Sequence, residues 1–346
     1  MLCPYKWSVF YAIENRYNLD AFALLEGRVS MNDPVVDFEC IQRDKNKRKK
    51  VINSSFIHRL QKRHFILFDI LPFLGTLVAL VLIPYIPFSS FELFLFFVFW
   101  LITGFGISSG YHRLFTHRSF KAKKVVEIAL AISGAMAGQG GVISWASLHR
   151  RHHELSDKQG DPHSPNLHGR GWRNIIRGLV HSHVSWMYKH DYPSVVHYVP
   201  DLIKDKTLVK IDRYYYLWAV AGLLLPTILG GIYHRSFEGA LSGFIWGGMV
   251  RMFWLEHTIW SINSFLHCFG TRRFQTQEQS HNFGLVALLT FGESWHNNHH
   301  AFPGSASFGL EWYRLDPASW LIHLLAALGL VSDIKIPSKD KIAAHS

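Results

Sequence analysis

Long apolar runs joined by short polar links dominate the pattern along this chain. Two runs, residues 70–86 and 91–109, come early, and two more, residues 214–233 and 239–259, come late. Each is close to the roughly 20 residues that an α-helix rising about 1.5 Å per residue needs to cross a bilayer. The pattern therefore predicts an all-α integral membrane protein with four spans in two hairpins, which turn near Ser89 and Arg235.

Two further apolar runs, residues 125–137 and 320–331, are too short to span. We expect interfacial or buried helices there. The first fifty residues are mixed in composition, so we expect residues 1–64 to form an N-terminal cytoplasmic segment that is partly disordered. The first fifteen residues lack the continuous apolar core of a signal peptide, which means that a later segment must direct insertion.

Composition supports a membrane setting. The chain has 346 residues, of which 49% are hydrophobic and 18% charged, and its net charge is +11. Basic clusters at residues 43–50, 58–64 and 121–124 lie beside apolar runs, as is typical of a cytoplasmic face near anionic lipid headgroups. Both termini and the middle segment, residues 112–213, are therefore expected in the cytoplasm. No nucleic-acid-binding module is present, so nucleic acid is not expected as a partner.

The cysteines indicate a reducing compartment. Cys3, Cys40 and Cys268 are odd in number and far apart. Neither a disulfide framework nor a Cys-x-x-Cys zinc site follows from that spacing.

Three histidine clusters lie on the predicted cytoplasmic side: "HRLFTH" from residue 112, "HRRHH" from residue 149 and "HNNHH" from residue 296. In the last two, histidines at i and i+4 share one helical face, so two rings can converge on one ion while the third points at a neighbour. His112 and His117 are about 140° apart on an α-helix, so both can bind metal only if the helix ends between them or if they serve different ions. This spacing suggests two metals. Eight histidines exceed the four positions of a zinc site, which favours two metals.

These strings resemble the membrane fatty acyl desaturases, and specifically the Δ9, stearoyl-CoA desaturase-like branch. The resemblance covers about residues 65–331 and rests on "GYHRLFTHRSFKA", "HRRHHELSDKQGDPHSP", "SHVSW", "NSFLH" and "GESWHNNHHAFP". It implies a di-iron centre in a cytoplasmic helical domain that caps the spans. It divides the chain into the N-terminal segment, a desaturase domain at residues 65–335 and a tail at 336–346. The ligands it implies are His112, His117, His149, His152, His153, His267, His296, His299 and His300, with Asn263 reaching an iron through water.

Nine neutral imidazoles leave the charge of two metal ions uncompensated, so acidic side chains should orient the rings from behind. Asp157, Asp161 and Glu293 are the candidates, although solvated loop acids are the alternative. His257 lies inside the fourth predicted span, and we expect it to contact Glu256 rather than to bind metal.

One stripe of the second span leads to the first histidine cluster. Trp100, Gly104 and Ser108 recur every four residues and end at His112. The hypothesis is that Gly104 and Ser108 leave room for an acyl chain whose tunnel Trp100 closes. Packing of small residues against another helix is the alternative. The resemblance implies that Trp260 lines the tunnel near the irons.

The resemblance implies an acyl desaturase that uses O2 and two electrons to introduce a cis double bond, at Δ9, into a saturated acyl chain. No "HPGG" haem motif occurs, so electrons must come from a separate cytochrome b5 or ferredoxin. Acyl-CoA, acyl-lipid and carrier-bound substrates stay open, because Gly140-Gly141 and Ser147-Leu148 replace the residues that contact coenzyme A in animal relatives.

Two alternatives stay open at this point. A membrane di-iron hydroxylase, or a desaturase of other regioselectivity, shares the boxes and the membrane setting. A histidine-rich metal transporter should instead place its ligands at mid-membrane, where only His257 lies.

Overall fold

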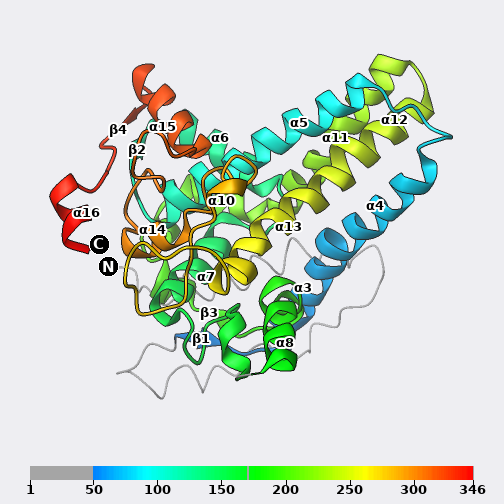
Figure 1. Cartoon of the computed structure of the whole chain (residues 1–346). Helices are drawn as coiled ribbons and strands as arrows, with labels where there is room; N and C mark the ends of the chain where they lie inside the picture. The colour runs from blue at the N-terminus through cyan, green and yellow to red at the C-terminus, as the bar shows by residue number, and fades with distance from the viewer. Residues whose placement is uncertain (1–49, 170, 346) are drawn as a thin grey trace, which may run out of the picture.

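The structure is a computed structural model that describes residues 50–169 and 171–345, and it is mainly helical (Figure 1). Its α-helices are α3 (Ser55–Phe65), α4 (Leu71–Leu82), α5 (Ser90–Phe105), α6 (Lys124–Ala135), α7 (Val142–Leu155), α8 (Trp172–His183), α9 (Val195–Tyr198), α10 (Lys206–Arg213), α11 (Tyr215–His234), α12 (Phe237–Gly243), α13 (Arg251–Ser264), α14 (His296–Ala301), α15 (Pro317–Ala327) and α16 (Lys339–His345). Within the described residues, strands occur only as two antiparallel pairs, β1 (Val51–Ile52) with β3 (Tyr192–Pro193) and β2 (Lys121–Ala122) with β4 (Val331–Ser332).

Short segments of other helix types complete the fold. Three π-helical segments, Ile66–Ile70, Gly106–Thr116 and Phe244–Val250, continue neighbouring α-helices without a break. Five 3-10 segments, Pro165–His168, Ser185–Tyr188, Leu202–Lys204, Phe265–His267 and Gly284–Val286, lie in the connections.

Three helices are long and apolar enough to cross a membrane: Ser55–Leu82, Ser90–Thr116 and Tyr215–His234. They coincide with three of the four predicted spans. The first begins fifteen residues before the predicted start, so the predicted boundary between residues 64 and 65 falls inside a helix. The second begins at a capping box, in which the Ser89 hydroxyl accepts from the Phe91 amide and Glu92 accepts from the Ser89 amide.

The fourth predicted span, residues 239–259, lies within one continuous helix from Phe237 to Ser264. Its composition is less apolar than that of the other three, since it includes Arg251 and Glu256, both fully buried. Glycines let it approach α11 closely: a Cβ on Gly243 would lie 2.2 Å from the carbonyl oxygen of Pro226. Close backbone contact of this kind is typical of helices that associate in a membrane.

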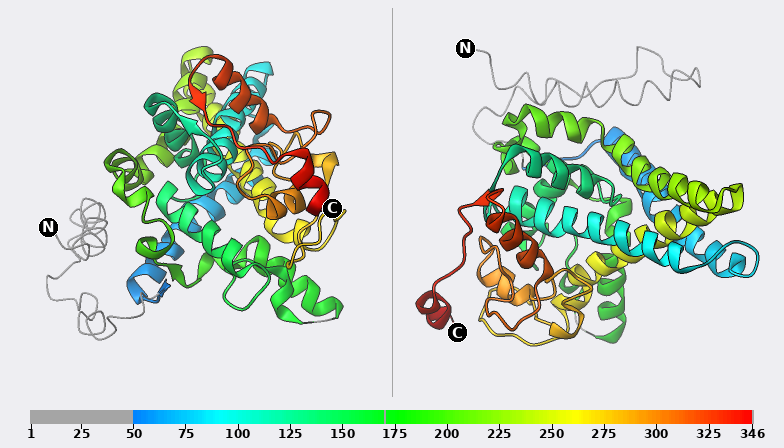
Figure 2. Two further views of the ribbon diagram at one scale, coloured as in Figure 1. Left: turned by 90° about the vertical axis from the view of Figure 1, so that its left-hand side faces the viewer. Right: turned by 90° about the horizontal axis from the view of Figure 1, so that it is seen from above.

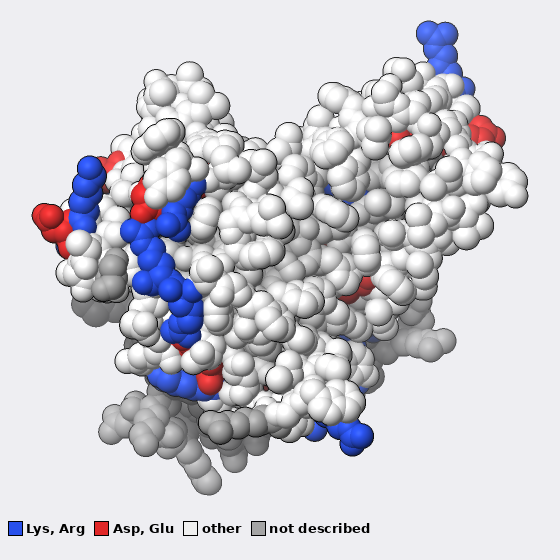
Figure 3. All heavy atoms as spheres, in the orientation of Figure 1, with Lys and Arg blue, Asp and Glu red and all other residues white. Residues whose placement is uncertain are grey.

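The long helices project together to one side of the molecule, and α14, α15 and α16 lie at the other end (Figures 1 and 2). Over the projecting helices the visible surface carries few charged atoms except at their tip, and Lys and Arg gather toward the opposite end (Figure 3). The uncharged surface includes exposed side chains such as Leu80, Val81 and Ile228. This arrangement suits a lipid environment around the long helices.

The two short apolar runs form α6 and α15, of 12 and 11 residues, which are too short to span. Each buries one face in the main core, which α6 joins through Leu130 and Ala131 and α15 through Ala318 and Ile322. They pack against the π-helical end of the second span, where a Cβ on Gly106 would lie 2.2 Å from the Gly134 amide nitrogen. The membrane helix thus continues directly into the core that holds the histidine clusters.

Candidate metal centre

The first histidine cluster lies at the end of the π-helical segment Gly106–Thr116, which continues the second span. In a π-helix the backbone bonds link residues five apart, so residues i and i+5 lie close to one above the other. The His117 amide accordingly bonds the His112 carbonyl at 3.1 Å, and the two ring centroids are 4.9 Å apart. Both rings therefore join one group. The spacing of His112 and His117 therefore does not require two ions. The sequence suggested two ions because we assumed an α-helix there.

The nine predicted histidine ligands form two groups. In each group the candidate ligand atoms all lie within 4.8 Å of one another. The first group is His112, His117, His149, His153 and His299; the second is His152, His267, His296 and His300. Helix α7 gives His149 and His153 to the first group and His152 to the second. Helix α14 gives His299 to the first group and His296 and His300 to the second. The i, i+4 pairs converge as the sequence indicated, and the third ring of each helix reaches the neighbouring group.

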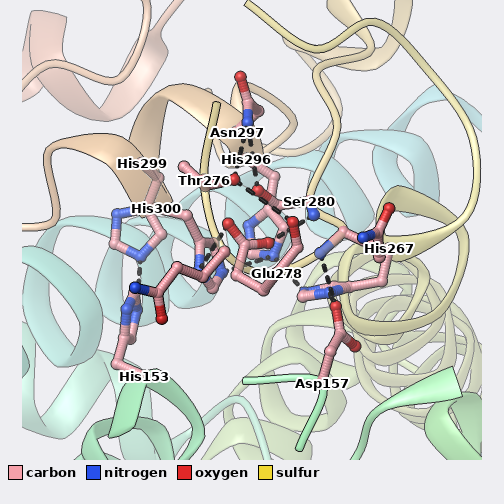
Figure 4. A network of polar contacts seen from close by, with 12 residues as sticks. His153, Asp157, His267, Thr276, Glu278, Ser280, His296, Asn297, His299 and His300 are labelled. Carbon is pink, nitrogen blue, oxygen red and sulfur yellow. Dashed lines mark hydrogen bonds and ion pairs between the residues drawn. The ribbon is translucent and has the colours of Figure 1, made fainter. Parts of the chain in front are cut away.

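The ring nitrogens named Nε2 face one another within each group (Figure 4). Nε2 of His299 lies 2.9 Å from that of His153 and 3.1 Å from that of His112. In the second group, Nε2 of His296 lies 2.9 Å from that of His267 and 3.1 Å from that of His300. Metal bonds of about 2.1 Å at right angles would set ligand nitrogens about 3 Å apart, so the spacing fits one ion per group.

Two of the inward nitrogens have no other partner. Nε2 of His117 and Nε2 of His152 are buried and make no hydrogen bond. A buried polar atom without a partner is costly, and a bound ion in each group would satisfy it.

Carboxylates hold the outer ring nitrogens. Nδ1 of His112 contacts Glu293, Nδ1 of His152 lies 3.0 Å from Asp161, and Nδ1 of His267 lies 3.0 Å from Asp157. All three acids proposed from the sequence thus lie behind histidines. Such a carboxylate fixes the tautomer, since it accepts a hydrogen bond from Nδ1–H and leaves the Nε2 lone pair free to bind metal.

A fourth carboxylate, Glu278, was not anticipated. It is buried, and one of its oxygens lies 3.8 Å from Nδ1 of His300. Figure 4 shows Glu278 among the histidines of the second group. Its local sequence, "RRFQTQEQS", is polar apart from Phe274 and gives no signal that distinguishes Glu278 from a solvated loop acid.

Charge and burial keep the site in the form that binds metal. Burial, reinforced by neighbouring imidazoles, lowers the pKa of His149, His153 and His299 well below the usual range, which favours the neutral ring at pH 7. Burial alone would raise the pKa of Asp157 and Asp161, but hydrogen bonds and charge interactions with His267 and His152 lower both. The acids are therefore anionic, and Asp161 in turn outweighs burial and raises the pKa of His152.

Asp157 also ties three segments together. Besides His267 it accepts hydrogen bonds from the Ser164 hydroxyl at 2.5 Å and from the Gln279 amide at 2.7 Å. It follows α7 in a left-handed conformation, with φ of 58°, that positions its carboxylate toward both loops. The end of one histidine helix thereby fixes the loop that carries Glu278.

Trp100, Gly104 and Ser108, which we expected to face an acyl chain, face other side chains of the protein. The Phe291 ring fills the space beside Gly104, where a Cβ would lie 2.1 Å from that ring. Phe291 also lies 4.7 Å, between ring centroids, from Trp100. The Ser108 hydroxyl donates to Glu293, so this residue supports the carboxylate behind His112. Gly104 thus packs against Phe291, and Ser108 holds Glu293 in place. Neither residue borders open space for an acyl chain.

The remaining predicted residues lie on or beside α13. Asn263 is half-buried on that helix, and within the described residues no hydrogen bond links it to the histidine groups. The Trp260 ring lies beside that of His257, tilted by 60°, with centroids 4.9 Å apart. His257 does not contact Glu256 as expected, because its Nδ1 lies 3.0 Å from Nε2 of His183.

Two further residues at the site were not anticipated. The Trp145 ring stacks on His149, with centroids 5.1 Å apart, and covers one side of the first group. Arg113, fully buried, donates to Asp316 at 3.0 Å and lies 3.5 Å from Glu293. The available signal was that Arg113 directly follows His112 in the sequence. An arginine buried beside a candidate ligand needs anionic partners, which Asp316 and Glu293 supply.

Comparison with known proteins identifies the class. The fatty acid desaturase family model matches residues 88–331. The chain belongs to that iron-using family of membrane oxidoreductases, in its Δ9 branch, as the resemblance indicated.

Individual relatives differ in what they act on. A hex-5-enoyl-[acyl-carrier protein] acetylenase of Moorena producens is 49% identical over 87% of this chain and 94% of its own length. An sn-1 stearoyl-lipid 9-desaturase of Anabaena variabilis is 37% identical over 70% of this chain and 83% of its own. Delta-9 acyl-lipid desaturase 1 of Arabidopsis thaliana is 35% identical over 69% of this chain and 74% of its own length.

The carboxylates behind the histidines should control metal retention. We expect Asp161→Ala, Glu293→Ala and Glu278→Ala each to weaken metal binding by about 10–100-fold, because the rings lose the partner that orients them. Iron bound after dialysis against a chelator, measured by mass spectrometry, is the readout. Asp333→Ala, at an exposed site away from the histidines, serves as control. Wild-type iron content in all three variants would contradict this role.

Proposed function

We propose that this protein is an acyl desaturase that removes two hydrogens from adjacent carbons of a fatty acyl chain at a di-iron centre. The observation that carries the proposal is the division of nine buried histidines into two groups, with Nε2 atoms inward and carboxylates behind four of the rings. In the balanced reaction, O2, two electrons and two protons take up the two hydrogens and leave as two waters. The irons, when bound, supply the activation of dioxygen.

The protein's own residues hold and shield this centre. His112 and His117 come from the second span, His267 follows α13, and the other rings come from α7 and α14, so four separate parts of the fold must be in register. Asn263 is proposed to reach an iron through water from one turn before His267. Burial of the rings keeps bulk water away from the reacting carbons.

The membrane arrangement follows from the same proposal. The helix Phe237–Ser264 is proposed as the fourth span, since it packs along α11 and is long enough to cross. Both termini and the histidine groups are then cytoplasmic, as the basic flanks indicate. Residues 65–335 make up the desaturase domain and residues 336–346 a tail.

The partners are an acyl substrate, O2, membrane lipids and a separate electron donor of the ferredoxin or cytochrome b5 type. Insertion of a cis double bond at Δ9 is supported by the relatives named as 9-desaturases. Trp100 is proposed to limit the acyl site from the second span, and Trp260 to line it near the irons.

Expression in a desaturase-deficient host tests the reaction. We expect a new unsaturated fatty acid, located by gas chromatography and mass spectrometry, with the wild type and none with His299→Ala, which removes a ring that faces both His112 and His153. His323→Ala, outside both histidine groups, should behave as wild type. A hydroxylated product, or equal product from His299→Ala, would contradict the proposal.

A second candidate is dehydrogenation near the methyl end of a short, carrier-bound acyl chain. Phe291 favours it, because its ring fills the space that a long chain would need between Gly104 and Trp100. The relative named as an acetylenase of a six-carbon carrier-bound chain supports it as well. Conversion of a double to a triple bond removes two hydrogens with the same balance of O2 and electrons.

Phe291 should therefore limit chain length. We expect Phe291→Ala to raise kcat/KM for longer acyl chains by at least about fivefold, since the space gained accommodates additional methylenes. Phe291→Leu is the milder variant should the alanine protein fold poorly, and Phe120→Leu, buried elsewhere, is the matched control. An unchanged chain-length profile in a folded, iron-loaded variant would show that Phe291 only packs.

A further inference from the structure

A basic face lies over the second histidine group. Its cations are Lys158, which is exposed, and three partly exposed arginines, Arg272, Arg273 and Arg314. Within the described residues, Glu311 is the one carboxylate that pairs with any of them, and it contacts both Arg273 and Arg314. Positive charge is therefore in excess on this face. Figure 3 shows Lys and Arg in a stripe over this end of the molecule.

Side-chain contacts join the four cations of the basic face into one surface. Lys158 donates to the Gln277 side chain at 3.2 Å, and Arg272 donates to the Gln279 side chain at 3.1 Å. Both glutamines belong to the loop at residues 271–280, which also carries two of the arginines. The contacts of Glu311 then connect this loop to the third arginine.

Exposed aromatic side chains lie beside these arginines. Trp312 is 93% exposed and Tyr313 is 60% exposed, and both come between Glu311 and Arg314 in the sequence. Trp, Tyr and Arg are the side chains that contribute most to binding at protein interfaces. Electron-transfer complexes are small, with less than about 1,200 Å² buried in total, so a few such side chains suffice for one.

The loop beneath the basic face is bonded to the helix that carries the second histidine group. The backbone amides of Arg273 and Phe274 both donate to Oδ1 of Asn297, at 2.8 Å each. Asn297 directly follows His296 on α14. The same loop carries Glu278, the carboxylate behind another ring of that group. The basic face therefore rests on the second group.

Trp295 connects the basic face to that group. The Arg314 guanidinium lies over its ring, 4.8 Å from the centroid, and its indole N–H donates to the Leu315 carbonyl at 2.8 Å. The residue is partly exposed, and it directly precedes His296 in the chain. An electron that arrives at this face therefore meets a conjugated ring one residue away from a predicted ligand of the second group.

The charge and the place of the basic face restrict its partner. A cationic surface steers an acidic protein toward it, and the proposed reaction needs two electrons from a separate protein. Anionic lipid headgroups also bind basic surfaces. However, α14, on which the face rests, lies at the end of the molecule away from the long helices (Figures 1 and 2). A donor that reaches this end need not be anchored in the membrane.

We propose that the basic face docks a soluble, acidic ferredoxin, with Trp312 as an aromatic contact and Trp295 between the docked protein and the second histidine group. This inference deepens the proposed function and rests on it. Each turnover oxidises two reduced ferredoxins by one electron each, and these are the two electrons of the balanced reaction. They pass to the ion that the second group would hold.

Binding of oxidised ferredoxin tests the basic face without turnover. Full-length, iron-loaded protein in phosphatidylcholine nanodiscs, which leave both membrane faces accessible, is titrated with a plant-type ferredoxin by microscale thermophoresis. We expect the double variant Arg272→Gln and Arg314→Gln to raise Kd at least about fivefold at about 0.05 M salt. The difference should shrink at about 0.5 M salt, because ions screen the charges.

A milder variant keeps the test possible should the double variant fold poorly. Lys158→Gln alters only an exposed side chain, and we expect it to raise Kd about twofold at low salt. The matched control is Arg173→Gln with Arg177→Gln, which removes the same charge from exposed positions of α8 and should bind ferredoxin as wild type.

The rate of electron transfer tests the place of Trp295. Oxidation of reduced ferredoxin is followed by stopped-flow absorbance at saturating ferredoxin. We expect Trp295→Leu to lower this rate at least about threefold without a change in Kd, and Trp295→Phe, which keeps an aromatic ring, to fall between Trp295→Leu and wild type. A wild-type rate in folded, iron-loaded Trp295→Leu would remove Trp295 from the route.

Three results would overturn the docking face. An unchanged Kd in the double variant and in Lys158→Gln would leave these charges to lipid headgroups. A Kd raised equally by the α8 control would show a general effect of charge. Tighter binding of the soluble domain of cytochrome b5, tested as a second probe, would overturn the choice of ferredoxin.

Product analysis separates the failure of this inference from the failure of the proposed function. A wild type that binds ferredoxin through the basic face and oxidises it, but forms no unsaturated product, contradicts the proposed function and supports the docking face. A wild type that forms the unsaturated product, while the double variant keeps the wild-type Kd, contradicts the docking face alone.

Discussion

The convergence of nine imidazoles is the constraint on which the rest of the structure depends. Ring nitrogens about 3 Å apart satisfy one another only in pairs, by an N–H···N hydrogen bond, whereas one cation satisfies a whole group of four or five rings. Burial lowers the pKa of His153, His296 and His299, which disfavours added protons there, so cations are the consistent solution. The carboxylates behind the rings serve the same end, because they fix the tautomer and offset the charge of the ions.

Membrane and metal site are joined by continuous helices. The second span becomes a π-helix as it reaches the site, and that change of pitch brings His112 and His117 to one group. The fourth long helix runs from its glycine contacts with α11 through Glu256 to His267. A shift of the second span along its axis would move His112 and His117 of the first group, and a shift of the fourth long helix would move His267 of the second. Close packing around both helices therefore matters to the site.

Sequence reasoning succeeded where a side chain's role follows from its spacing. The histidine clusters, the acids Asp157, Asp161 and Glu293 and three of the long helices could be predicted, since composition and i, i+4 spacing are local properties. It failed where the outcome depends on partners distant in the chain. Glu278 looked like a solvated acid, and Phe291 gave no sign that it would fill the space beside Gly104.

The π-helix and the fourth span show two other limits. Spacing arguments assumed 3.6 residues per turn, so they separated His112 from His117, which the wider helix unites. The fourth run was read as an ordinary span although it contains Arg251 and Glu256, and the length of a run does not reveal how buried charges are satisfied. Arg251 is satisfied by the carbonyls of Met136 and Gly222, which come from other parts of the fold.

Diffraction from crystals of the iron-loaded protein at the iron absorption edge tests the central claim most directly. The account predicts two anomalous peaks, one among His112, His117, His149, His153 and His299 and one among His152, His267, His296 and His300. A single peak, a peak at the edge of another metal, or iron bound away from both groups would contradict it.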